Sequence, residues 1–162
     1  MSRPPLSPRT AIMLVFAAFG SLIGLWAGSI PLVTLQAGVS SYQLGLGLAA
    51  STLASVLSMS LGGVIGKHFS NRAVLLVLLP LDAVLTLGLM TAGSVFWFFL
   101  FIITQAAVMG LTDIFMNAEA SAIEHDMQKP IFTAFHGGAS LAMAIFAIVS
   151  SLVSAWAGTH VS

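Results

Sequence analysis

Two carboxylates lie inside long apolar runs of this sequence. Asp82 stands in the middle of one run, and Asp113 stands in the second half of the next. An ionisable side chain in hydrocarbon costs at least about 2.5–3.5 kcal/mol, so it needs a partner or a water-filled cavity. Asn117 follows Asp113 by four residues, which places both on one face of a helix. His136 lies further along, beside two glycines that would let a neighbour approach.

Asp113, Asn117 and His136 therefore predict a polar cluster that opens to a central cavity. Its chemistry would be hydrogen bonding to a solute or transfer of a proton. The alternative is that these side chains only satisfy hydrogen bonds between helices, and for His136 such a packing role is favoured. Nothing in the sequence identifies a partner for Asp82.

No enzymatic constellation accompanies these residues. The sequence has no G-x-S-x-G, H-E-x-x-H, paired-cysteine or P-loop pattern, and it has no cysteine at all. We therefore expect neither an enzyme nor a metal or cofactor site. Five Lys and Arg are too few to neutralise a phosphate backbone, so a nucleic-acid partner is excluded.

The amino-acid composition indicates whether water or lipid surrounds the chain. Of 162 residues, 58% are hydrophobic and 6% are charged, and the mean hydropathy is +1.05. A soluble domain is about one-quarter charged, so this chain lacks the polar surface that water requires. We expect an all-α integral membrane protein in contact with lipid.

Five runs are long enough to cross a bilayer, which takes about 20 apolar residues. The predicted spans are residues 10–36, 42–65, 73–91, 95–123 and 131–157. A tail at residues 1–9 precedes this bundle of residues 10–157, a charged loop at residues 124–130 separates the last two spans, and residues 158–162 follow. All five Lys and Arg fall on one side of such a bundle, which predicts a cytoplasmic N-terminus and an external C-terminus.

Small residues recur along the first span. Gly20, Gly24 and Gly28 are spaced by four and so share one helical face. In lipid, such a stripe lets another helix backbone approach closely. We expect these glycines to pack against a neighbouring helix; the same stripe would also permit helices to slide.

The link after the second span reads GGVIGKHFSNR at residues 62–72. It resembles G-G-x-x-G-D-R-F-G-R-R, the signature of the major facilitator superfamily between helices two and three. The matching positions are Gly62, Gly63, Gly66, Phe69 and Arg72. Lys67 replaces the acid of the signature. The resemblance implies that this link takes part in gating.

Two further stretches, 19–45 and 110–136, resemble a bacterial subgroup that includes fucose-permease-like and YbjJ-like carriers. The resemblance implies an inner-membrane carrier for a small polar solute, a sugar or related metabolite, working by alternating access and either proton-linked or facilitative. In this family the first and fourth helices line the path and the fifth borders it. That implies solute or proton contacts for Asp113, Asn117 and His136.

The superfamily has twelve helices in two halves, with the site at their interface. Five helices make part of the N-terminal half, so we expect a truncated or partial carrier. Its expected partner is the missing C-terminal half or a second copy. The alternative is a structural or regulatory subunit that packs against a partner membrane protein and transports nothing.

Overall fold

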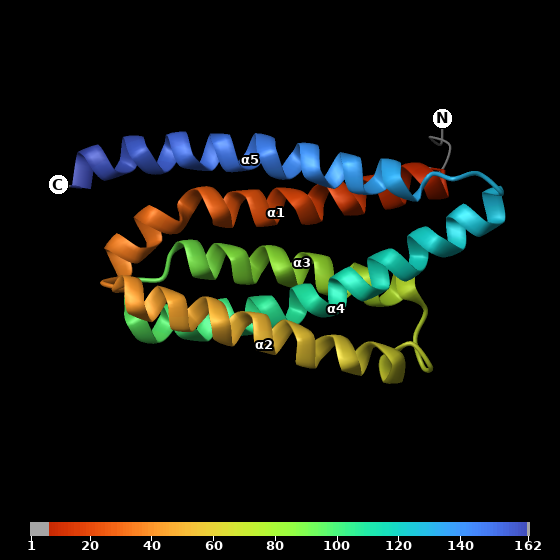
Figure 1. Cartoon of the computed structure of the whole chain (residues 1–162), viewed down its shortest axis with the longest axis horizontal. Coiled ribbons are helices and arrows are strands. Elements are labelled where there is room, and N and C mark those ends of the chain that lie inside the picture. Colours follow the sequence, from red (N-terminus) through yellow and green to blue (C-terminus); the bar gives the residue numbers. More distant parts are fainter. Residues whose placement is uncertain (1–6, 162) are drawn as a thin grey trace, which may run out of the picture.

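The computed structural model describes residues 7–161, and in this part of the chain five α-helices form an antiparallel bundle without strands (Figure 1). The helices are α1 (Pro8–Ala37), α2 (Ser41–Ile65), α3 (Asn71–Met90), α4 (Val95–Met127) and α5 (Phe132–Val161). Each of the five is long and apolar enough to cross a membrane. The predicted all-α class with five spanning helices is confirmed.

Several helices begin before the predicted spans because serine caps precede them. The Ser7 hydroxyl accepts a hydrogen bond from the Thr10 amide, and Pro8 occupies the first turn of α1. The Ser70 hydroxyl accepts from the Ala73 amide at the start of α3. Such caps satisfy amides that have no partner within the helix. Residues 1–6 of the expected tail lie outside the described residues.

The fourth helix also continues further than expected. Residues 124–127, assigned to a charged loop, extend α4 to Met127, and the left-handed backbone of Gln128 ends it (φ 52°). The loop prediction is therefore wrong for these residues. Glu124 is thus a helical residue, and its carboxylate binds the start of the next helix: Oε2 accepts hydrogen bonds from the Ile131 amide (2.8 Å) and the Phe132 amide (2.5 Å). At the other end, α5 continues through Val161, beyond the predicted span.

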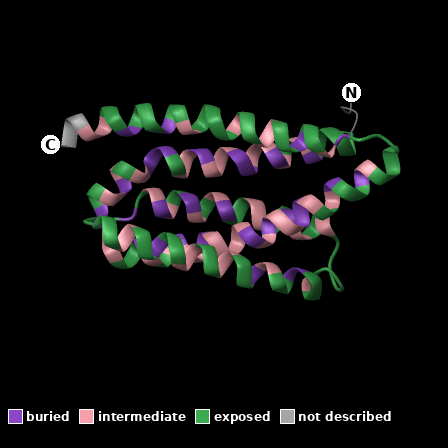
Figure 2. Cartoon of the chain, in the orientation of Figure 1, coloured by how far each residue is buried: buried purple, intermediate pink, exposed green. Residues whose placement is uncertain are grey.

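The helices pack in two groups. Figure 1 shows α5 along α1 on one side of the bundle, while α2 and α3 lie against α4 on the other. α1 joins the groups by packing on α3 and α4, whereas α5 scarcely touches α4. Buried residues concentrate on α1, α3 and α4, and the outer faces of α2 and α5 are exposed (Figure 2). Those exposed faces are rich in Leu, Val, Ile and Phe, as lipid contact requires.

Candidate functional site

Asp113 lies where two cavities meet. The larger, of about 380 Å³, is bounded by α1, α2 and α4. The smaller, of about 160 Å³, is bounded by α1, α4 and α5. Asp113 and Phe19 line both. A half-buried carboxylate therefore faces a space that residues of four of the five helices line.

The larger cavity has a polar side on α2. Ser51, Thr52 and Ser55 line it opposite Asp113. The hydroxyls of Ser51 and Thr52 donate to the Leu48 carbonyl within their own helix. Their oxygens keep a free lone pair and so can accept a hydrogen bond from a ligand. This side of the cavity offers hydroxyls, and the other side offers a carboxylate.

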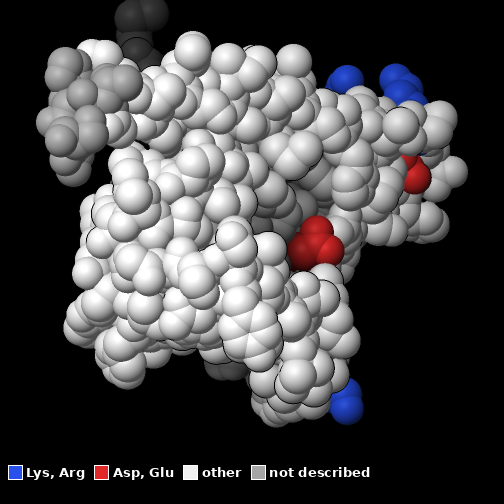
Figure 3. Space-filling view, turned by 60° about the vertical axis from the view of Figure 1, so that its left-hand side comes forward, with Lys and Arg blue, Asp and Glu red and all other residues white. Residues whose placement is uncertain are grey.

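The smaller cavity contains His136 as well as Asp113. The His136 ring packs between aromatic rings, with centroid distances of 5.1 Å to Phe16 and 4.9 Å to Phe132. The structure thus places His136 and Asp113 on one cavity, while the contacts of the imidazole itself are aromatic packing contacts. Viewed from one side, the molecule has a hollow beside which acidic atoms lie, in a largely uncharged surface (Figure 3).

Asn117 holds Asp113 from one turn away. Its side-chain nitrogen lies 3.1 Å from Oδ1 of Asp113 and 2.9 Å from the Asp113 carbonyl oxygen. The Asn117 Oδ1 atom is buried without a hydrogen-bond partner among the described residues. Asn117 lines neither of the two cavities. It therefore orients the carboxylate and does not itself face the open space.

Asp82 is on a different interface. It is fully buried, and its Oδ2 accepts a hydrogen bond from the Thr112 hydroxyl at 2.5 Å. One turn along α3, Thr86 donates to the Asp82 carbonyl (2.8 Å) and accepts from Nε2 of Gln105 (3.1 Å). Two hydrogen bonds between buried side chains thus join α3 to α4 at this level of the bundle. The partner of Asp82 that the sequence did not reveal is Thr112.

The residues of the link after α2 have different surroundings. A Cβ atom on Gly62 would lie 2.9 Å from the Ile114 side chain on α4, and one on Gly66 would lie 3.2 Å from the Gly62 carbonyl oxygen. A Cβ on Gly63 would meet nothing within 4 Å. Lys67 is exposed. Close approach therefore requires glycine at Gly62, but not at Gly63.

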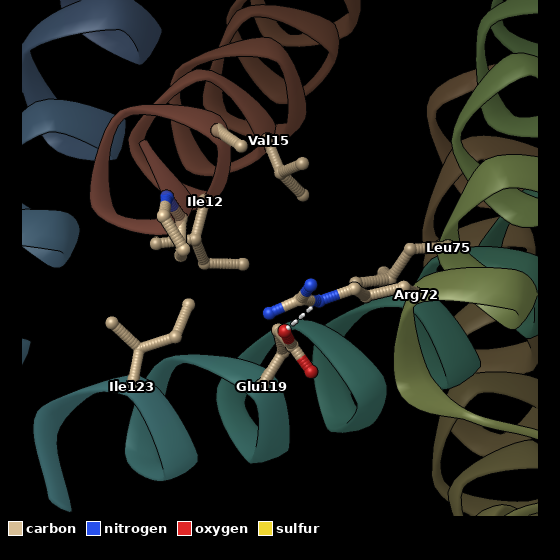
Figure 4. Close-up of a pocket in the computed structure, with 8 residues that line it drawn as sticks. Ile12, Val15, Arg72, Leu75, Glu119 and Ile123 are labelled. Carbon is tan, nitrogen blue, oxygen red and sulfur yellow. Dashed lines mark hydrogen bonds and ion pairs between the residues drawn. The ribbon is translucent and has the colours of Figure 1, made fainter. Parts of the chain in front are cut away.

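Arg72 forms an ion pair that the sequence did not predict. Its Nε lies 2.6 Å from Oε1 of Glu119 on α4, at the edge of a cavity of about 170 Å³ (Figure 4). Figure 4 shows Ile12, Val15 and Leu75 around the same space. The Asn71 amide reaches the other Glu119 oxygen at 3.5 Å. This pair links α3 to α4 at the end of the bundle where the basic residues gather.

The small residues of α1 lie against the backbone of α5. A Cβ on Gly20, Gly24 or Gly28 would collide with the carbonyl oxygens of Ala139, Met143 and Ala147, respectively. Ser150 completes the contact by donating to the Leu25 carbonyl at 2.7 Å. The absence of side chains on these three glycines is what allows α1 and α5 to pack closely.

Sequence reasoning missed Phe19, the α2 hydroxyls as cavity residues, and Glu119. The four-residue step from Ser51 to Ser55, with Thr52 between them, was a usable signal because it puts hydroxyls on one helical face. No comparable signal paired Glu119 with Arg72. Among residues 7–161, no three His, Asp or Glu side chains lie close enough to hold a metal ion.

Comparison with known proteins adds an independent observation. A Yersinia pestis protein named as an uncharacterized MFS-type transporter is 28% identical over 138 residues, which are 83% of this chain and 35% of that protein. The membrane protein MosC of Rhizobium meliloti is 29% identical over 134 residues, 81% of this chain and 32% of MosC. The chain thus spans about a third of the length of these relatives. No family model and no solved structure matches it.

These similarities agree with the fold. The five helices are long and apolar enough to cross a membrane, and the relative in Yersinia pestis is named as a transporter. The described residues are all-helical, and the chain is similar over most of its length to a protein named as an MFS-type transporter.

Proposed function

We propose that these five helices form part of a major facilitator carrier that moves a small polar solute across the bacterial inner membrane by alternating access. The observation that carries this proposal is the position of Asp113 on two cavities shared by α1, α2, α4 and α5. In this proposal further helices complete the path, supplied by the second half of the carrier or by a second copy.

The solute class follows from the groups that line the larger cavity. A carboxylate accepts hydrogen bonds, hydroxyls accept and donate them, and an aromatic face packs on C–H groups. Asp113, Ser51, Ser55 and Phe19 supply these groups. A neutral polyhydroxylated solute such as a sugar fits this set better than an anion, which the carboxylate would repel.

In a proton-linked carrier, Asp113 and His136, which line the same cavity, would hold the coupled proton. The link at residues 62–72, from Gly62 to Arg72, would act in gating, and the ion pair of Arg72 with Glu119 supports a role for it at that end of the bundle. Both are roles that the superfamily resemblance suggests.

Uptake of radiolabelled hexoses into proteoliposomes tests the proposal. The chain is assayed alone and together with the C-terminal half of its Yersinia relative. We expect uptake with the second half present, and a loss of at least about tenfold in Asp113→Asn, since a charged hydrogen bond contributes about 1.5–3 kcal/mol. Asn117→Ala should lower uptake less, because it removes only the group that orients Asp113.

Thr104→Val is the matched control on α4. Its hydroxyl bonds only carbonyls of its own helix and faces neither cavity, so uptake should be unchanged. Wild-type uptake in Asp113→Asn would reject Asp113 as a solute or proton site. If uptake is absent with any added C-terminal half and the chain binds stably to another membrane protein, the structural-subunit alternative is favoured.

A further inference from the structure

We propose that Asp82 is a positioning residue: through Thr112 it sets the rotation of α4 and thereby points Asp113 at the two cavities. The proposal rests on the proposed function in one respect, namely that Asp113 is the solute or proton group. It gives a purpose to a buried carboxylate that neither cavity exposes.

The first step is the register of α4. Thr112 faces α3 and bonds to Asp82, and the next residue, Asp113, faces the cavities. Consecutive helical residues differ by about 100° around the axis, so the two side chains occupy different faces of one rigid rod. Any bond that holds Thr112 in place also determines where Asp113 points.

The second step is that hydrogen bonds between α3 and α4 oppose rotation of α4 at two levels along its axis. Thr112 bonds Asp82 (2.5 Å), and Gln105, seven residues earlier on the same face, bonds Thr86 (3.1 Å). All four side chains are buried. In a bilayer, apolar burial does not drive helices together, so packing and polar bonds of this kind determine how they dock.

The third step is the size of the effect. A rotation of α4 by about 10° moves an atom about 6 Å from its axis by about 1 Å. Hydrogen bonds are confined to donor–acceptor distances of about 2.7–3.2 Å, so such a shift breaks a bond between Asp113 and a ligand. Loss of the Asp82–Thr112 bond should therefore act on Asp113 without any direct contact.

The test uses the absence of cysteine from the sequence. Met109 lies one turn before Asp113 and lines the same cavity, so Met109→Cys provides a single thiol that reports the rotation of α4. The full chain in membrane vesicles is labelled with a water-soluble maleimide, and the labelling rate is measured. Transport is not needed for this readout, so failure of the proposed function and failure of this proposal are distinguishable.

In this background, Asp82→Ala and Thr112→Val should each change the labelling rate by about threefold or more, the factor to which an average interhelical hydrogen bond corresponds. Asp82→Asn keeps an oxygen that accepts from Thr112 and should restore the parent rate. Ser29→Ala is the matched control, since it removes an equally buried hydroxyl that bonds only the Trp26 carbonyl in its own helix.

If Thr112→Val is labelled at the same rate as the Met109→Cys parent, the proposal is overturned. That variant preserves side-chain volume, so it decides the question even where Asp82→Ala is lost from the membrane. An altered rate in Asp82→Asn as large as in Asp82→Ala would overturn it too, because bulk packing and not the bond would then be responsible.

Discussion

The Nε atom of Arg72 lies 2.6 Å from Oε1 of Glu119, and this ion pair joins the first turn of α3 to α4. The two partners are unequally exposed: 67% of the Arg72 side chain is accessible, against 13% for Glu119. Removing the cation therefore leaves a sheltered carboxylate without its partner, which is more harmful than losing an exposed pair.

Arg72→Ala should lower the thermal unfolding midpoint by a few degrees, measured in detergent by size-exclusion chromatography after heating. Lys67→Ala, an exposed cation of the same link, should have no effect. The double variant Arg72→Ala/Glu119→Gln should recover part of the loss, because no unpaired charge remains. Equal unfolding midpoints for Arg72→Ala and Lys67→Ala would show that the Arg72–Glu119 ion pair does not stabilise the fold.

The α1–α5 contact should be sensitive to a single methyl group. Gly24→Ala puts a Cβ against the Met143 carbonyl oxygen, and forcing the helices apart should cost about 1–3 kcal/mol. Gly63→Ala is the matched control in α2, where the added Cβ meets nothing within 4 Å. That change should be neutral or slightly stabilising, because alanine favours a helix. Thermal unfolding of the two variants tests this, and equal midpoints would contradict the prediction.

Glu124 should control the start of α5. Glu124→Ala removes the acceptor for the Ile131 and Phe132 amides, a capping loss of about 1 kcal/mol. Hydrogen exchange at those two amides should become about fivefold faster, the factor that this energy corresponds to. Asp126→Ala, at an exposed position in the same segment, should leave their exchange unchanged. Identical exchange in both variants would contradict the capping role.

Thiol labelling of intact spheroplasts tests the expected orientation. Single cysteines replace Gly93 in the α3–α4 link and Lys129 in the α4–α5 link, in a sequence that has no other. With a cytoplasmic N-terminus, an impermeant maleimide should label Gly93→Cys at once and Lys129→Cys only after permeabilisation. The reverse pattern would invert the proposed topology.

The five helices could be predicted because long apolar runs dominate every other signal in this sequence. Their ends could not be predicted as well, since they depend on local bonds such as the Ser70 cap of α3 and on the role of Glu124 beyond the expected end of α4. A hydropathy pattern contains no information about either.

For the candidate site, the sequence indicated Asp113 because a carboxylate in an apolar run is unusual. It could not pair Asp82 with Thr112, or Arg72 with Glu119, because 30 and 47 residues separate these partners. Such pairings depend on which helices are neighbours and on how they are aligned along their axes. Packing between the helices determines that alignment, and the sequence alone does not reveal it.

The uneven packing of α5 has a thermodynamic consequence. Because α5 rests on α1 and scarcely on α4, the α1–α5 seam and the α3–α4 polar bonds share no side chains. Changes at sites without shared partners add in free energy. The double variant Gly24→Ala/Thr112→Val should therefore lose the sum of the two single losses in free energy of unfolding. Asp113 lies on α4 between these two contacts and lines the cavities bounded by α1, α2, α4 and α5.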